Sequence, residues 1–185
     1  GELARQKEKD DKKAMEMYMK AIHITLPDFD GKNPLRNNLL TFDEIMIINA
    51  IAILHAKADD IMTAVQLGMW LKKYMEEKIV DGTMKIAKYP MILYNLSNWL
   101  GRENCHKEAL KMADLGIRFC VRYGNLAFFP ILVFNKGGAL AELGKIDQAK
   151  KYLHQSVTIF EAMDRPDLIQ VATDWCKLHY RIDIQ

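Results

Sequence analysis

Residues 135–156, NKGGALAELGKIDQAKKYLHQS, decide the fold, because residues 95–116, NLSNWLGRENCHKEALKMADLG, carry the same pattern. Both stretches begin with asparagine, and Asn95 and Asn135 lie 40 positions apart. Each stretch reaches an alanine 14 residues after its asparagine. Repetition at about 34–47 residues is typical of an array of stacked helix pairs. The sequence therefore predicts a helical repeat, and directs attention to what lies in its groove.

Composition is that of one ordinary globular domain. The chain has 185 residues, half of them hydrophobic, which is enough for a substantial core. Its 10 glycines and 5 prolines are few, and this scarcity favours helices over a β fold with many turns. The formal net charge of +2 gives no basic signature of nucleic-acid binding.

The cysteines and the apolar runs indicate a compartment. The three cysteines, Cys105, Cys120 and Cys176, are odd in number and widely spaced, which fits a reducing environment and argues against disulfides. No signal peptide and no apolar run long enough to span a bilayer is visible. We therefore expect a cytoplasmic protein that does not contact a membrane.

Apolar periodicity predicts about nine helices, paired through short loops, with no strand. Thr41 and Glu44 form a capping box that begins one helix. Pro27 is expected to end the first helix, and Pro130 is tolerable only in a first helical turn. Residues 81–83 are expected to form a turn. Eight of the predicted helices span residues 11–25, 42–57, 61–78, 85–100, 106–123, 126–143, 147–163 and 168–180.

Small residues recur where paired helices must approach each other closely. A bulky side chain at such a position would push the helices apart, at a cost of roughly 1–3 kcal/mol. The positions expected to have this role are Ala14, Ala21, Ala64, Ala109, Gly116, Ala149 and Ser156.

These residues resemble the tetratricopeptide repeat. That family has Asn-Leu-Gly in its first helix, a glycine near the turn and small residues in its second helix. Gly144 matches the turn, Asn104 replaces that glycine in the earlier copy, and Ser97 and Lys136 depart from the motif. The resemblance implies an all-α fold, a right-handed superhelix of antiparallel helix pairs. It implies a single domain over residues 1–185, with about four repeat units and a terminal helix.

The repeats are longer than the usual 34 residues, and in this they resemble the C-terminal domain of Gram-positive regulators related to Rgg and PlcR. In that family an N-terminal helix-turn-helix domain binds DNA, while the repeats dimerise and bind a short quorum-sensing peptide. The resemblance implies the ligand-sensing and dimerisation domain of a transcriptional regulator, a homodimer that contacts DNA only through a domain absent from this chain. Residues 1–4 read as the middle of a helix, so we expect a fragment that lacks the DNA-binding domain.

A stand-alone tetratricopeptide scaffold for protein–protein interaction is the alternative. It would bind protein segments in the same groove without regulating transcription. The residues that precede Gly1 in the natural protein distinguish the two hypotheses, because a scaffold would have further repeats there.

The first helix of each pair lines the concave face of such an array. In related domains the asparagine of the Asn-Leu pair projects into this groove, where its amide can pair with a peptide backbone. Alternatively, these asparagines satisfy backbone groups inside the array. The residues expected to bind peptide are Asn49, Tyr94, Asn95, Asn98, Arg102, Phe134 and Asn135.

Arg102 and Lys136 could bind a peptide carboxylate, with Arg102 favoured for its bidentate geometry. The alternative for each is a solvated charge near a helix end. Cys105 and His106 are adjacent, but no second cysteine or histidine lies at ligand spacing, so no metal site is predicted. The motifs of hydrolases, metalloproteases and phosphate loops are absent. The sequence therefore predicts no catalytic residues, no cofactor and no enzyme.

The last predicted helix, residues 168–180, carries Trp175 on an apolar side. Trp175 either packs on the last repeat or belongs to a dimer surface. The resemblance to regulators that dimerise through C-terminal repeats supports the second hypothesis.

Overall fold

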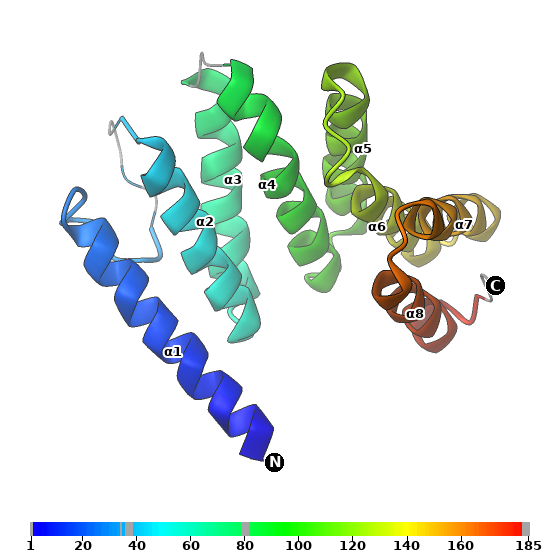
Figure 1. Ribbon diagram of the computed structural model, residues 1–185, viewed down its shortest axis with the longest axis horizontal. Coiled ribbons are helices and arrows are strands. Elements are labelled where there is room, and N and C mark those ends of the chain that lie inside the picture. The colour runs from blue at the N-terminus through cyan, green and yellow to red at the C-terminus, as the bar shows by residue number, and fades with distance from the viewer. Residues whose placement is uncertain (1, 34, 36–38, 79–81, 183–185) are drawn as a thin grey trace. The chain divides into compact units, whose positions relative to one another are not determined.

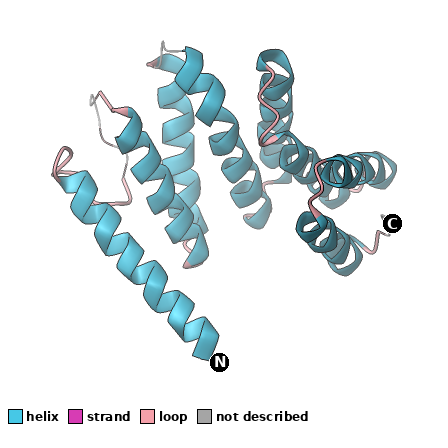
Figure 2. Ribbon diagram, viewed as in Figure 1, coloured by secondary structure: helices cyan, strands magenta, loops and turns pink. Residues whose placement is uncertain are grey.

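The computed structural model describes residues 2–33, 35, 39–78 and 82–182. These residues form eight α-helices and one short π-helix, without a strand among them (Figures 1 and 2). The predicted all-α class is confirmed. The chain divides into two compact units, Gly1–Val80 and Asp81–Gln185, which are described separately below. The single repeat domain over residues 1–185 stays a prediction.

Unit 1 contains α1 (Glu2–His23), α2 (Phe42–Lys57) and α3 (Ile61–Glu77), and α2 packs against both of the others. The predicted first helix was wrong at both ends: α1 begins at Glu2 and already ends at His23. It ends before Pro27 because the chain turns there and buries Leu26 and Phe29.

The predicted capping box of α2 is confirmed. The Thr41 hydroxyl accepts a hydrogen bond from the Glu44 backbone N–H, and the Glu44 carboxylate accepts one from the Thr41 backbone N–H at 2.6 Å. The two bonds satisfy amide groups that the first turn of a helix leaves without intrahelical partners.

Unit 2 contains α4 (Gly82–Arg102), α5 (His106–Tyr123), α6 (Phe129–Glu142), α7 (Ile146–Ala162), α8 (Pro166–Trp175) and the π-helix η1 (Cys176–Tyr180). Each α-helix packs against the next along the chain. Figure 1 shows them in green, yellow and orange-brown.

Three predicted boundaries in unit 2 were wrong. Gly82 and Thr83 begin α4 instead of forming a turn, and Asp81 lies outside the described residues. The helix expected from Leu126 begins at Phe129, although Pro130 lies in its first turn as predicted. The last α-helix gives way at Cys176 to a π-helix.

One left-handed turn joins the helices of every described pair. Asp59, Asn104 and Gly144 follow α2, α4 and α6 with φ of +66°, +58° and +74°. In the turn after α4, Cys105 N–H bonds to Leu100 C=O at 2.9 Å, and the turns after α2 and α6 make the equivalent bond. This is the Schellman arrangement, which satisfies the last carbonyls of a helix. The same turn geometry thus follows α2, α4 and α6.

In unit 2, the small residues predicted to lie between closely packed helices are buried at such contacts. A β-carbon on Gly116 would lie 2.8 Å from Leu132 of α6, and the side chains of Ala109, Ala149 and Ser156 are buried. In unit 1, Ala64 is buried and Ala14 half-buried. Ala21 is exposed, contrary to the prediction, because its neighbour Ile22 takes the buried face of α1.

Helix α4 contains a proline, Pro90, well inside its length. Proline has no N–H, so the carbonyl four residues earlier, that of Ile86, loses its intrahelical donor. The Asn125 side-chain amide donates to that carbonyl at 2.6 Å, from the turn between α5 and α6. This long-range bond fixes the start of α6 against α4, the two helices that carry most of the site described next.

Candidate functional site: a groove in unit 2

Unit 2 holds a cavity of about 570 Å³. Ligand-binding cavities commonly enclose about 300–1,000 Å³. Helix α4 supplies one wall with residues spaced three and four apart, which places them on a single helical face. They are Tyr94, Ser97, Asn98, Gly101 and Arg102.

Two more helices line the cavity in the same way. The lining residues of α6 are Ile131, Phe134, Asn135, Gly138, Ala139 and Glu142, and those of α8 are Leu168, Val171, Ala172 and Trp175. The remainder comes from α5, α7 and η1, through His106, Ala109, Phe160 and Tyr180. The first helices of two successive pairs and the helix that follows them thus line one groove.

Aromatic rings dominate the walls. Tyr94 stacks on Phe128 with 6.1 Å between ring centroids, and burial raises the pKa of the Tyr94 phenol. Tyr180 crosses over α6, where a β-carbon on Gly138 would lie only 2.8 Å from its hydroxyl oxygen. Burial raises the pKa of Tyr180, and the nearby Glu142 carboxylate adds to the rise. Both phenols therefore stay neutral and can donate hydrogen bonds.

Charged and titratable groups gather where α4 and α6 end. Arg102 and Glu142 lie 40 positions apart, at the last residue of each helix, and both line the cavity. His106, which begins α5, places Nε2 4.0 Å from Oε2 of Glu142. The groove therefore combines apolar walls with one polar end, and suits a ligand that has both kinds of group.

Five of the seven predicted peptide-binding residues lie in the lining of this cavity. They are Tyr94, Asn98, Arg102, Phe134 and Asn135. Asn95 is buried, one position away from the stripe, and Asn49 is buried within unit 1. For Asn135, the alternative foreseen from sequence also holds, since Nδ2 donates to the Tyr94 carbonyl at 3.4 Å.

Lys136 does not line the cavity. Its Nζ lies 2.6 Å from Oδ1 of Asp114 on α5 and 4.1 Å from the centroid of the Tyr152 ring on α7. Burial lowers the pKa of Lys136, but these two partners outweigh burial and raise it overall. Lys136 thus joins three helices, and the prediction that it could bind a peptide carboxylate is replaced by this structural role.

The sequence reasoning missed Ser97, His106 and Glu142. The signals were present: Ser97 lies three residues after Tyr94, on the same helical face, and Glu142 is the 40-residue equivalent of Arg102. The contributions of Tyr180 and Trp175 to this cavity had no such signal, because they depend on where α8 and η1 fold back.

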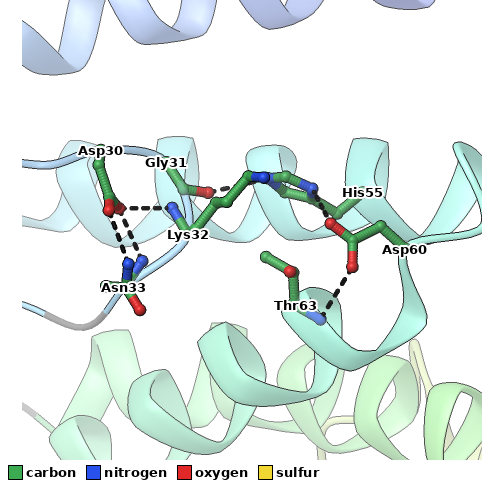
Figure 3. A network of polar contacts seen from close by, with 7 residues as sticks. All are labelled: Asp30, Gly31, Lys32, Asn33, His55, Asp60 and Thr63. Carbon is green, nitrogen blue, oxygen red and sulfur yellow. Dashed lines mark hydrogen bonds and ion pairs between the residues drawn. The ribbon is translucent and has the colours of Figure 1, made fainter.

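A second polar cluster lies in unit 1 (Figure 3). His55 contacts Asp60 through Nδ1 at 3.0 Å and the Gly31 carbonyl through Nε2 at 2.9 Å. Asp60 is also the N-cap of α3 and accepts from Thr63 N–H. Burial raises the pKa of Asp60, but these bonds and the His55 charge lower it overall. The cluster therefore ties the loop before α2 to the α2–α3 turn.

The described part of the chain can also be compared with the requirements of metal sites, reactive thiols and membrane spans. No group of three or more histidine, cysteine, aspartate or glutamate side chains there could hold a metal ion. Burial raises the pKa of Cys120 and of Cys176 to about 11, which keeps both thiols protonated. Among the described helices, none has the length and apolarity needed to cross a bilayer.

Comparisons of the chain with protein-family models, curated proteins and solved structures found no match.

Proposed function

We propose that the groove of unit 2 binds a short peptide, and that the chain is the ligand-sensing and dimerising part of a transcriptional regulator. The observation that carries the peptide half is the convergence of three helical stripes on one cavity of about 570 Å³. Its walls offer aromatic rings for apolar side chains and amide, hydroxyl and charged groups at defined places. An extended peptide carries both kinds of group along its length.

The regulatory half of the proposal rests on the resemblance to Rgg- and PlcR-like regulators. A right-handed tetratricopeptide superhelix would change its curvature slightly when a peptide joins α4, α6 and α8. The peptide would then favour one spacing of DNA-binding domains carried by the two copies of a homodimer. The stand-alone scaffold differs only in having no such domain.

Dimerisation has a surface to support it. Leu178 of η1 is large and apolar, yet it is 76% exposed and does not line the groove. We expect Leu178→Asp to shift the chain from dimer to monomer in sedimentation equilibrium. A wild-type chain that sediments as a monomer at tens of micromolar would contradict this part.

Peptide binding can be tested without knowing the natural peptide. Random heptapeptides displayed on phage are selected against the whole chain, and the best one is synthesised for calorimetry. Gly101 lines the cavity, and nothing lies within 4 Å of where its β-carbon would be. Gly101→Leu would therefore fill the groove without disturbing packing, and we expect it to abolish binding of the selected heptapeptide.

Gly82→Leu is the matched control. Nothing lies within 4 Å of where a β-carbon on Gly82 would be, as at Gly101, but Gly82 does not line the cavity. It should leave binding unchanged. Failure to select any peptide, or equal binding to the Gly101→Leu variant, would refute groove binding. The regulatory half is refuted if the natural protein carries no helix-turn-helix domain.

A further inference from the structure

Two buried polar atoms in the wall of the groove have no hydrogen-bond partner among the described residues: Oγ of Ser97 and Nδ1 of His106. Ser97 is only 3% exposed. A buried hydroxyl without a partner costs folding free energy, and native proteins rarely leave one so. Both atoms belong to residues that line one cavity, so a ligand bound there could complete their hydrogen bonding.

The hydroxyl of Ser97 is the more informative of the two. A serine inside a helix commonly bonds to a carbonyl of its own preceding turn. Ser156, the other fully buried serine of unit 2, does this, since its Oγ lies 2.7 Å from the Leu153 carbonyl. Ser97 makes no such bond, so its hydroxyl remains available to donate and to accept.

His106 contributes the second unpartnered atom, the ring nitrogen Nδ1. Its Nε2 faces the Glu142 carboxylate at 4.0 Å, and a proton on Nε2 favours that approach. In the neutral ring, a proton on Nε2 makes Nδ1 an acceptor, and this is the atom that lies buried without a partner. In that tautomer the groove has one acceptor that can take an N–H, beside one hydroxyl that accepts or donates.

We propose that Ser97 and His106 recognise main-chain amide groups of the peptide. A peptide backbone supplies N–H donors for the imidazole and both donors and acceptors for the hydroxyl, whatever its side chains. The apolar walls then select the side chains. This inference rests on the proposed peptide binding and assigns the backbone contacts to two residues outside the set predicted from sequence.

Ser97→Ala tests the assignment through two measurements, peptide affinity and thermal stability. We expect the affinity to fall and the stability not to fall. In calorimetry, the selected heptapeptide should bind this variant about three- to tenfold more weakly, the loss that one hydrogen bond commonly brings. In thermal unfolding without peptide, the same variant should be as stable as wild type or more stable, because an unsatisfied hydroxyl is removed. A structural role for Ser97 would lower stability and affinity together.

Ser156→Ala is the matched control, a buried serine outside the cavity whose hydroxyl is already bonded. It should leave affinity unchanged. For His106, heptapeptides in which single amides are replaced by esters locate the N–H that it accepts. One ester should weaken binding to wild type about three- to tenfold and leave binding to His106→Phe unaffected.

The outcomes separate the two proposals. If Gly101→Leu abolishes binding but Ser97→Ala and His106→Phe bind every heptapeptide as wild type does, peptide binding in the groove stands and the backbone assignment is wrong. If the selected heptapeptide binds Gly101→Leu as well as it binds wild type, groove binding itself is wrong. If all three variants lose affinity and Ser97→Ala keeps its stability, both are supported.

Discussion

The pairs α4–α5 and α6–α7 have the same turn between their helices, but different side chains fill the layer where the two helices meet. In α6–α7 a glycine on the first helix, Gly137, faces a leucine on the second, and a β-carbon on Gly137 would lie 2.7 Å from Cγ of Leu153. Forty residues earlier the equivalent positions hold Ser97 and Ala113, both buried. The later pair fills this layer from α7, whereas the earlier pair has a side chain on α4 that lines the groove. Positions 40 residues apart can therefore fill a packing layer in one helix pair and line a cavity in the other.

The same two pairs differ at a shared proline. Pro90 and Pro130 are 40 positions apart, but Pro130 begins α6 whereas Pro90 lies inside α4. A proline in a first turn leaves no intrahelical bond unmade, whereas one inside a helix frees a carbonyl. Asn125 satisfies the carbonyl freed in α4. The extended first helix thus depends on a partner that the shorter one does not need.

The largest effect is expected at the leucine that fills the later pair. Leu153→Ala should lower the free energy of unfolding by about 2–5 kcal/mol, because it leaves a cavity above Gly137. Urea denaturation measures the loss. Ala113→Leu, the reverse change in the earlier pair, should be destabilising through overpacking. A loss below about 1 kcal/mol for Leu153→Ala would mean that the two pairs do not differ in this way.

A smaller loss is expected when the facing glycine gains a side chain. Gly137→Ala should cost about 1–3 kcal/mol, since the new methyl group would meet the Leu153 side chain and its backbone nitrogen. In a Leu153→Ala background most of this cost should vanish, and a double-mutant cycle in urea measures the coupling. Additive effects would show that the two residues do not share one layer.

The turns allow a comparison of glycine with asparagine in one conformation. Gly144→Ala should cost about 1–2 kcal/mol, because φ of +74° places a β-carbon against the backbone. Asn104→Gly should instead raise the melting temperature slightly, since asparagine tolerates this region but glycine adopts it freely. Thermal unfolding of both variants checks the opposite signs. A loss of stability in Asn104→Gly would indicate a role for its side chain.

The smallest effect concerns the proline of α4. Asn125→Ala should cost about 1 kcal/mol through loss of the bond to the Ile86 carbonyl. Pro90→Ala should cancel the part of that loss that comes from the Ile86 carbonyl, because the restored N–H at position 90 can donate to it. The bond from Ala127 N–H to Asn125 Oδ1 stays lost. Hydrogen exchange at the new amide would report the bond. Equal losses in Asn125→Ala with and without Pro90→Ala would contradict this account.

Much of the helical plan could be predicted locally. The capping box at Thr41 and the left-handed turn at Gly144 depend only on neighbouring residues, so the sequence carries them directly. The errors have non-local causes. α1 ends earlier than predicted because the chain turns there and buries Leu26 and Phe29. Pro90 lies inside a helix, as the predicted span 85–100 implied, but only the structure shows that Asn125 bonds to the carbonyl that Pro90 leaves free.

The residues of the candidate site likewise fall into two groups, those that could be predicted from sequence and those that depend on helix packing. The 40-residue period and the helical spacing identified Tyr94, Phe134 and Arg102 as members of one surface, and all three line the cavity. They could not reveal that Lys136 is bound to Asp114, since that pairing depends on how α5 and α6 pack. Nor could they show that His106 places an unpartnered nitrogen in the wall.

The sequence by itself determined that this chain is helical, where most of its turns lie, and most of the small residues at which helices approach each other. These properties follow from backbone conformation and the spacing of side chains over a few residues. Only the tertiary structure decided that α8 and η1 fold back to place Trp175 and Tyr180 beside α4 and α6, and that Ser97 lies buried without a hydrogen-bond partner. Enclosure and unsatisfied polarity are properties of several packed helices, so no single stretch of sequence contains them.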